Sequence, residues 1–343
     1  MQEQNLENPL LGKHVLTAQQ FDKQSILKTM KVASRMHTER RTSPKPIKLA
    51  EGKVLANLFF EPSTRTASSF AAAMLKLGGS VVTLDEKTSS SQKGETTEDT
   101  IRTISQYADV IAMRHPEEGS VLNAAQYSTR PVVNAGDGGG EHPTQALLDI
   151  FCIMQELCVD DLNGLNITLC GDLLNGRTVH SLSHLLSNFE GLTINCVAPD
   201  ILQMPDSVVQ HLKDSKVNVN LMDSYVRVSD NSSYHFFEEL KLQHPTPNRY
   251  NEVMPETDIF YMTRVQKERF ETAEAYEACK GLYILTPEDL NAAKDRMAVM
   301  HPLPRVDEID VGVDQDPRAA YFRQVGCGLS LRMALLGMVM GVA

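Results

Sequence analysis

The chain has 343 residues, of which 42% are hydrophobic, and it carries a formal net charge of −11. At roughly 100–200 residues per domain, this length predicts about two domains. An acidic balance disfavours nucleic acid and anionic membrane surfaces as partners, because both attract basic proteins. Any cluster of arginine and lysine side chains therefore needs a local cause, such as an anionic ligand.

The six cysteines form no C-x-x-C pair and lie in apolar stretches, which predicts buried thiols in a reducing compartment. No apolar run reaches the length of a membrane span, and the first dozen residues do not resemble a transit peptide. No spacing typical of metal ligands is present. We therefore expect a soluble cytoplasmic protein without a metal or another cofactor.

Strands and helices alternate through the first part of the chain. Apolar runs and start signals predict helices at 17–40 (with Thr17 as N-cap), 63–77, 97–107 and 143–157, and strands at 54–60, 80–84, 110–113 and 131–135. The stretch 86–95 is rich in serine and lysine and has no apolar anchor, so it predicts an exposed loop.

The same alternation restarts after residue 157. Strands are expected at 165–170, 193–197, 217–221, 258–262 and 296–300, with helices at 179–189, 206–213 and 329–340, the last of them buried. The polar and aromatic segment 223–251 interrupts the pattern, and we expect an insertion on the surface with one helix at 236–242. The fold class is therefore α/β, with two domains that are each a parallel sheet wrapped by helices.

The run from Leu58 to Thr66 is the feature around which the chain is organised. An apolar strand ends at Glu61 and Pro62, and a helix then opens with Ser63, Thr64, Arg65 and Thr66. Unpaired N–H groups and the positive end of the helix dipole favour an anion at such a junction, and an arginine adds a forked clamp. By itself the run is also typical of an ordinary hydroxyl N-cap.

Other predicted strands also end in polar or charged residues. In open α/β sheets the carboxyl ends of the strands form the ligand crevice, so these residues predict a site for substrates that carry several negative charges. His142 and Gln145 open the helix at 143–157, where the histidine is either a capping residue or a donor to a carbonyl oxygen. No nucleophile-and-base pair is present, which favours direct group transfer by charge and positioning. The strand-end residues are Arg114, Gly171-Asp172, Thr263-Arg264 and the run His301 to Arg305.

Six motifs in order make the sequence from about residue 16 to 336 resemble the transcarbamoylase family. Four are shared by the family as a whole: Ser63-Thr64-Arg65-Thr66, Met113-Arg114-His115-Pro116, His142-Pro143-Thr144-Gln145 and Gly176-Arg177-Thr178-Val179-His180-Ser181. Two more are similar to those of its aspartate-using members: Thr263-Arg264-Val265-Gln266-Lys267-Glu268-Arg269 and His301-Pro302-Leu303-Pro304-Arg305.

The resemblance implies transfer of the carbamoyl group from carbamoyl phosphate to L-aspartate, which gives N-carbamoyl-L-aspartate and phosphate in de novo pyrimidine synthesis. Residues implied to hold carbamoyl phosphate are Ser63, Thr64, Arg65, Thr66, Arg114, His142, Gln145, Pro302 and Leu303. Of these, Thr66, Arg114 and His142 would stabilise the oxyanion, while Gln145 and the carbonyls of Pro302 and Leu303 would hold the carbamoyl NH₂. Residues implied to hold aspartate are Lys93, Arg177, Arg264 and Gln266.

The resemblance also implies a homotrimer with shared active sites, in which Ser89 and Lys93 enter a neighbouring subunit's site. Glu61, Arg177 and Arg269 would bridge the two domains on closure, and Leu303-Pro304 would be a cis peptide. The carbamoyl-phosphate domain would comprise residues 1–143 and 328–343, and the aspartate domain residues 144–327. Association with other pyrimidine enzymes or with a regulatory chain is a further implied possibility.

Two alternatives remain open from the sequence. Ornithine transcarbamoylases share the first domain's chemistry, but they typically carry a cysteine where Pro302 stands here. A catalytically silent copy that serves assembly is the other alternative. Such a copy loses charged site residues early, since keeping them costs stability. Here Arg65, Lys93 and Arg114 are all present.

Overall fold

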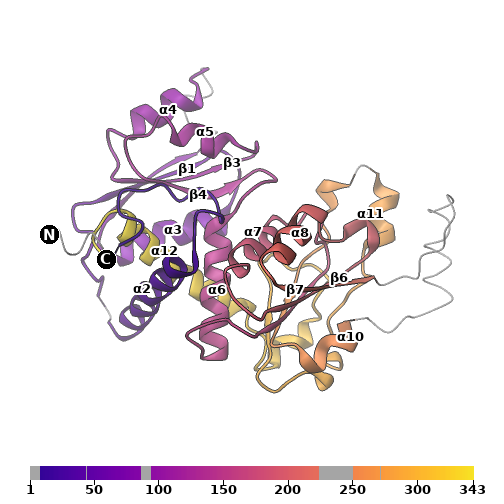
Figure 1. The fold of residues 1–343 in the computed structure, drawn as a ribbon. Coiled ribbons are helices and arrows are strands. Elements are labelled where there is room, and N and C mark those ends of the chain that lie inside the picture. The colour runs from indigo at the N-terminus through magenta and orange to yellow at the C-terminus, as the bar shows by residue number, and fades with distance from the viewer. Residues whose placement is uncertain (1–7, 44, 86–93, 224–249, 271) are drawn as a thin grey trace. The chain divides into compact units, whose positions relative to one another are not determined.

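The computed structural model describes residues 8–43, 45–85, 94–223, 250–270 and 272–343. The chain divides into two compact units, Met1–Cys152 with Val325–Ala343 (unit 1) and Ile153–Gln324 (unit 2). Figure 1 shows both units as sheets flanked by helices. The predicted insertion helix at 236–242 and most of the predicted loop at 86–95 lie outside the described residues.

The sheet of unit 1 is parallel throughout, with the strand order β2-β1-β3-β4. Its central strands are buried along almost their whole length, as expected for a parallel sheet covered on both faces. In Figure 1, α4 and α5 cover one face, where their apolar side chains pack against β1 and β3. The strands are β1 (Val54–Phe59), β2 (Ser80–Asp85), β3 (Val110–His115) and β4 (Val132–Asp137).

The helices of the first part of the chain confirm the predicted alternation, with one N-cap corrected. The N-cap of α2 is Asp22, whose carboxylate accepts the N–H of Ser25, and not Thr17. Aspartate has a free carboxylate at the right spacing, whereas Thr17 precedes a short turn. The helices are α2 (Lys23–Thr42), α3 (Thr64–Lys76), α4 (Thr97–Ile104), α5 (Ser120–Ala125) and α6 (Pro143–Leu157).

The C-terminal helix α12 (Tyr321–Val339) begins eight residues before the predicted start at residue 329. Gly326 and Gly328 lower the local helix propensity, which is why the sequence favoured a later start. Close packing explains one of them, because a Cβ on Gly328 would lie 2.9 Å from Nη1 of Arg332 and 3.1 Å from Cδ2 of Leu148. The predicted burial of the second half of the helix is confirmed.

The sheet of unit 2 is also parallel, with the strand order β7-β6-β5-β8-β9. Its strands are β5 (Asn166–Cys170), β6 (Thr193–Ala198), β7 (Asn218–Asp223), β8 (Ile259–Met262) and β9 (Ala298–Met300). Its helices are α7 (Arg177–Leu186), α8 (Asp206–Asp214), α10 (Tyr250–Val253) and α11 (Ala273–Cys279). Short 3₁₀ helices are η3 (Asp200–Leu202), η4 (Met254–Glu256), η5 (Lys267–Arg269), η6 (Asp289–Ala292) and η7 (Val311–Gln315).

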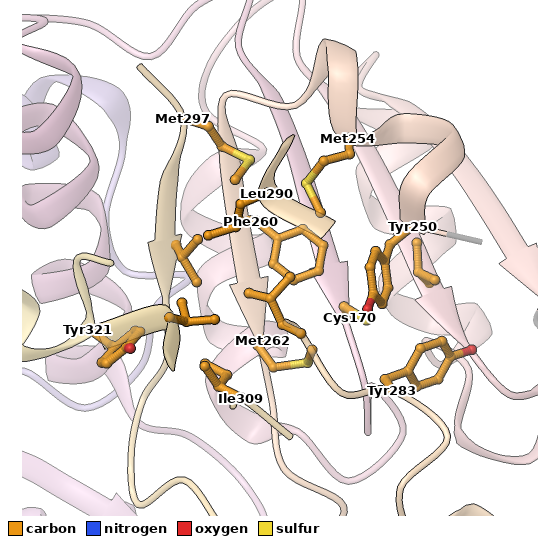
Figure 2. Close-up of a cluster of buried hydrophobic side chains, with 14 residues drawn as sticks. Cys170, Tyr250, Met254, Phe260, Met262, Tyr283, Leu290, Met297, Ile309 and Tyr321 are labelled. Atoms are coloured by element: carbon orange, nitrogen blue, oxygen red, sulfur yellow. The ribbon is translucent and has the colours of Figure 1, made fainter. Parts of the chain in front are cut away.

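Methionine and tyrosine side chains fill much of the unit 2 core, in a chain without tryptophan. Figure 2 shows Met254, Met262 and Met297 around Phe260 on β8. Tyr250 is fully buried there, and its single hydroxyl proton is shared between two acceptors, the carbonyl of Ile284 (2.9 Å) and Asp289 (3.0 Å). The sequence had placed Tyr250 in the surface insertion, which is wrong, because its ring packs edge-on against Phe260.

The cysteines are all free thiols, and five of the six are buried. Burial raises the pKa of the Cys196 thiol to about 12. Cys158 is the exception: it directly follows α6 with φ of +54° and is exposed, so its predicted burial is wrong. Within the described residues, no helix combines the length and apolar character needed to cross a bilayer.

Candidate active site

The N-terminus of α3 lies at the carboxyl end of β1, as the sequence predicted. Ser63 occupies the N-cap position, but its side chain makes no capping hydrogen bond, so the hydroxyl-cap interpretation is wrong in this respect. Thr66 is buried in the first turn, while Thr64 and Arg65 are exposed. The positive end of the helix dipole, the hydroxyls and the Arg65 guanidinium thus meet at one helix start, an arrangement that favours an anion.

Arg114 is the buried cation of this edge of the sheet. Its side chain is 10% exposed, and its guanidinium donates to Oε1 of Glu61 (3.1 Å) and to the carbonyl of Ala135 (3.4 Å). Gly136, with φ of +129°, lets the guanidinium approach, because a Cβ there would lie 2.6 Å from Nη1. Glu61 after β1 and the last residues of β4 therefore fix Arg114, near the end of β3, at the carboxyl edge.

Glu61 pairs with Arg114 inside unit 1. The sequence assigned this carboxylate to a bridge with Arg177 and Arg269, and that bridge stays a prediction. In the structure Glu61 neutralises a guanidinium that would otherwise be buried without a countercharge.

His142 and Gln145 stand at the start of α6. His142 is 5% exposed, and its carbonyl accepts the N–H groups of Gln145 (3.0 Å) and Ala146 (3.3 Å). Pro143, the first helical residue, has no N–H to leave unpaired at this position. The side-chain Nε2 of Gln145 donates to Oδ1 of Asp149 one turn further on (2.9 Å).

In unit 2 the ends of β5 and β8 meet closely. Gly171 has φ of +110°, and a Cβ there would lie 2.3 Å from the carbonyl oxygen of Thr263. The Thr263 hydroxyl donates to the carbonyl of Cys170 (3.0 Å). This contact fixes the chain that leads from one strand end to Asp172 and from the other to Arg264.

Asp172 organises the predicted aspartate-binding segment, a role that sequence reasoning did not assign. Burial raises the pKa of this fully buried carboxyl group, and it accepts the backbone N–H groups of Asn175 (2.9 Å) and Gln266 (3.3 Å). The Gln266 side chain donates to the carbonyl of Asn175 (2.9 Å). Arg177 begins α7 two residues later, so Arg177 and Gln266 are built on one hydrogen-bonded network.

Arg264 lines a pocket of about 40 Å³ beside these strand ends, together with Gly171, Thr263, Lys280 and Asp307. Lys280, just beyond the short helix α11, is a cation at this pocket that sequence reasoning missed, because it follows no predicted strand. Arg269 is exposed at the end of η5. Ser89 and Lys93 lie outside the described residues.

The turn after β9 is held by a buried pair, His301 and Glu308, whose side chains are 1% and 6% exposed. Nδ1 of His301 accepts the N–H of Leu303 (2.8 Å), so the proton must sit on Nε2, which donates to Oε1 of Glu308 (2.6 Å). Glu308 also accepts the N–H groups of Val306 and Asp307. The pair therefore fixes the backbone around Pro302 and Leu303, and the predicted cis peptide Leu303-Pro304 is confirmed.

Arg305 has a structural role rather than one facing a ligand. Its guanidinium binds Asp314 through two hydrogen bonds of 2.5 and 2.6 Å and contacts the Tyr321 hydroxyl. The Asp314 carboxylate raises the pKa of Arg305. Among the strand-end arginines that the sequence singles out, Arg305 therefore has its hydrogen-bond and charge partners within unit 2.

The Glu308 carboxyl group predicts an acid-sensitive contribution to stability. Burial by itself would raise its pKa, but the hydrogen bonds from His301 and from the backbone outweigh burial and hold the pKa below the usual 4.5. The stabilisation is therefore present above the unfolded-state pKa and is lost as the pH falls through the lower folded-state pKa. In urea titrations we expect the free energy of unfolding to fall below pH 4.5 more steeply for the parent than for Glu308→Gln. Parallel curves would contradict this.

Two family models match almost the whole chain. The aspartate/ornithine carbamoyltransferase carbamoyl-P binding domain matches residues 13–155, and the Asp/Orn binding domain of the same family matches residues 163–339. The structure with carbamoyl phosphate and aspartate of aspartate transcarbamoylase from Trypanosoma cruzi superposes with a TM-score of 0.84 at 40% identity. It covers 97% of this chain and 98% of that one.

Curated relatives agree with these matches. The aspartate carbamoyltransferase catalytic subunit of Thermococcus onnurineus is 42% identical over 332 residues, which is 96% of this chain and 98% of the relative. The multifunctional protein CAD of Squalus acanthias is 46% identical over 338 residues, 98% of this chain but only 14% of the relative. The chain thus spans about one seventh of the length of that multifunctional protein. Because both family models match in order and a full-length relative is 42% identical, the chain belongs to the aspartate/ornithine carbamoyltransferase family.

Proposed function

We propose that the protein is an aspartate carbamoyltransferase, a transferase that converts carbamoyl phosphate and L-aspartate into N-carbamoyl-L-aspartate and phosphate in pyrimidine synthesis. The observation that carries the proposal is the buried Arg114 at the carboxyl edge of the unit 1 sheet, beside the α3 N-terminus that carries Ser63 to Thr66. A helix start with an arginine suits the phosphate, and a second fixed guanidinium suits a developing oxyanion.

The reaction needs no covalent intermediate on the protein. The neutral amino group of aspartate attacks the carbamoyl carbon and the carbonyl oxygen gains negative charge. The bond between the carbamoyl carbon and the phosphate oxygen then breaks, and phosphate leaves with the bonding electrons and takes up the proton that the amino nitrogen loses. Donors already aimed at that oxygen lower the barrier, because they do not reorganise during the reaction. The proposed donors to the oxyanion are Thr66, Arg114 and His142.

The remaining roles are shared between the domains. Residues 1–143 and 328–343 form the carbamoyl-phosphate domain and residues 144–327 form the aspartate domain, and each domain also contributes residues that bind the other substrate. Gln145 and the carbonyls of Pro302 and Leu303 accept hydrogen bonds from the carbamoyl NH₂. The proposed phosphate ligands are Ser63, Thr64, Arg65 and Thr66, and the proposed aspartate ligands are Lys93, Arg177, Arg264 and Gln266.

We further propose a cytoplasmic homotrimer with shared sites, in which Ser89 and Lys93 of each chain serve a neighbour. Glu61 and Arg269 would take part in domain closure. The multifunctional relative supports association with other enzymes of the pathway, since there a similar segment is joined to further domains. Mass measured in solution with and without substrates tests the trimer, and a monomer with full activity would contradict it.

The choice of aspartate over ornithine is tested by product formation with each amino acid. Pro302, Arg264 and Lys267 favour a dicarboxylate, because an arginine and a lysine repel the ammonium of ornithine. We expect carbamoyl-aspartate and no citrulline. Citrulline without carbamoyl-aspartate would identify the protein as an ornithine transcarbamoylase. If neither product forms, the catalytically silent copy is favoured.

Arg65→Ala tests the phosphate half of the site. Arg65 is exposed at the start of α3, so its removal leaves the core intact, and we expect an unchanged circular dichroism spectrum and unchanged subunit assembly. Turnover should fall by about 100-fold or more, since a charge-assisted clamp on the leaving phosphate is lost. Activity within a few-fold of the parent would contradict the clamp.

A further inference from the structure

Two ionisable side chains, Asp149 and Arg332, are buried in unit 1, and Asp149 contacts Gln145. Asp149 on α6 is fully buried, and Arg332 on α12 is 5% exposed. Burial lowers the pKa of Arg332 to about 10, while the charge of Asp149 raises it, so the guanidinium is protonated at neutral pH. Two charges have therefore been taken out of water next to a proposed substrate ligand.

Arg332 is held in place on several sides. Its Nη1 donates to the hydroxyl of Ser69 on α3 (2.8 Å), and its guanidinium stacks over the ring of Phe70 at 5.1 Å. The missing side chain of Gly328 leaves room for Nη1. Buried acidic and basic side chains are often no more stabilising than apolar residues of the same volume, so stability by itself does not explain why Asp149 and Arg332 are present.

Asp149 determines which way the Gln145 amide points. Asp149 lies four residues after Gln145, on the same face of α6, and its Oδ1 accepts from Nε2 of Gln145 (2.9 Å). An ionised carboxylate only accepts hydrogen bonds, so the NH₂ arm of the amide must face Asp149. The other arm, Oε1, is then presented away from Asp149 as an acceptor.

We infer that Asp149 is a positioning residue that sets donor specificity, by holding Oε1 of Gln145 as the acceptor for the carbamoyl NH₂. The inference rests on the proposed role of Gln145 in carbamoyl transfer. Without the carboxylate, the amide can turn by half a rotation and present its own NH₂ to the substrate's NH₂. Acetyl phosphate carries a methyl group at that position, so its binding does not depend on the amide's orientation.

Asp149→Asn in the full chain tests this, because an asparagine can face Gln145 with either its oxygen or its NH₂. We expect the KM for carbamoyl phosphate to rise by about 10- to 100-fold. Inhibition by acetyl phosphate, measured against carbamoyl phosphate, and the KM for aspartate should stay as in the parent. Equal weakening of both acyl phosphates, or no change in either, would overturn the inference.

A second variant protects the test against misfolding. Asp149→Leu combined with Arg332→Met removes both buried charges, and such apolar replacements are often neutral for stability. The double variant also removes the acceptor for Nε2 of Gln145. We therefore expect the same rise in the KM for carbamoyl phosphate, with inhibition by acetyl phosphate unchanged. Retained discrimination between the two acyl phosphates in this folded variant would overturn the inference.

A double-mutant cycle separates positioning from a general structural effect. In a Gln145→Met background, Asp149→Asn should cause no further change in the ratio between the two acyl phosphates, because the amide it orients is gone. An added effect of similar size would show that Asp149 acts by another route, and would overturn the inference. A parent without carbamoyl transfer would instead overturn the proposed function.

Asp109→Asn is the matched control. Asp109 accepts from the Val54 N–H (2.9 Å) and from Nζ of Lys53 (3.1 Å) at the amino ends of β1 and β3, the opposite edge of the same sheet. The same chemical change there should cost stability without altering the preference for carbamoyl over acetyl phosphate. If Asp109→Asn changes that preference, the preference depends on the stability of the protein and not on the Gln145 amide, and the inference is overturned.

Discussion

Arg114→Ala should lower kcat by about 100- to 1,000-fold, the range found when one preorganised oxyanion donor is removed. The structure gives the reason: the guanidinium is fixed before substrate arrives, by Glu61 on one side and the Ala135 carbonyl on the other. A fixed donor does not reorganise in the transition state, so its loss falls on kcat as well as on substrate binding. Steady-state kinetics with both substrates measures the effect.

The fold should survive this change. The Glu61 side chain is 35% exposed, so its carboxylate can be hydrated once the guanidinium is gone. An unaltered circular dichroism spectrum is therefore expected. Arg102→Ala is the control, since Arg102 forms an exposed ion pair with Asp99 on α4 and stacks over the exposed ring of Tyr127, and such surface contacts contribute little. Activity of Arg114→Ala within a few-fold of the Arg102→Ala variant would refute the oxyanion role.

Gly171→Ala should destabilise unit 2 by about 3–5 kcal/mol. The added Cβ would lie 2.3 Å from the Thr263 carbonyl oxygen and 2.7 Å from its hydroxyl, at a backbone with φ of +110°. Neither neighbour can yield cheaply, because the Thr263 N–H and hydroxyl both donate to the Cys170 carbonyl. Urea unfolding followed by circular dichroism measures the loss.

Gly164→Ala separates backbone strain from the clash. Gly164 also has a positive φ, +76°, but a Cβ there would meet nothing within 4 Å. Only the conformational cost remains, about 1 kcal/mol. If both alanine variants lose the same free energy of unfolding, the close approach of the β5 and β8 ends does not contribute to the effect of Gly171→Ala. If Gly171→Ala remains folded, we expect a raised KM for aspartate, because Asp172 and the Gln266 backbone would shift.

Elements with strong local signals were predicted well, and elements decided by packing were not. The helix Pro143–Leu157 was predicted with both ends correct, since proline at its first position and a long apolar pattern are signals carried by the residues themselves. The start of α12 was misplaced because Gly328 reads locally as a helix breaker. A glycine is required at position 328 because the Arg332 side chain occupies the space of a Cβ, and this contact exists only in the folded protein.

The exposure of single residues shows the same limit. Tyr250 stands next to a polar segment, and only the arrangement of β8 and the loop around Asp289 reveals that its ring fills the core. Cys158 follows an apolar helix, yet it lies at the surface because the helix ends at the preceding residue. A neighbourhood in sequence is not a neighbourhood in space.

The fold class and the identity of the strand-end residues follow from the order of the amino acids alone. Parallel strands bring their carboxyl ends to one edge, so polar residues that follow buried runs can be assigned to a common edge of each sheet without coordinates. How those side chains are held depends on contacts made after folding: Glu61 binds Arg114, Asp149 binds Gln145, and Glu308 binds His301. Hydrogen bonding depends on ångström distances and on which atom carries the proton. Both are set when the chain has packed, and neither is encoded in a run of neighbouring residues.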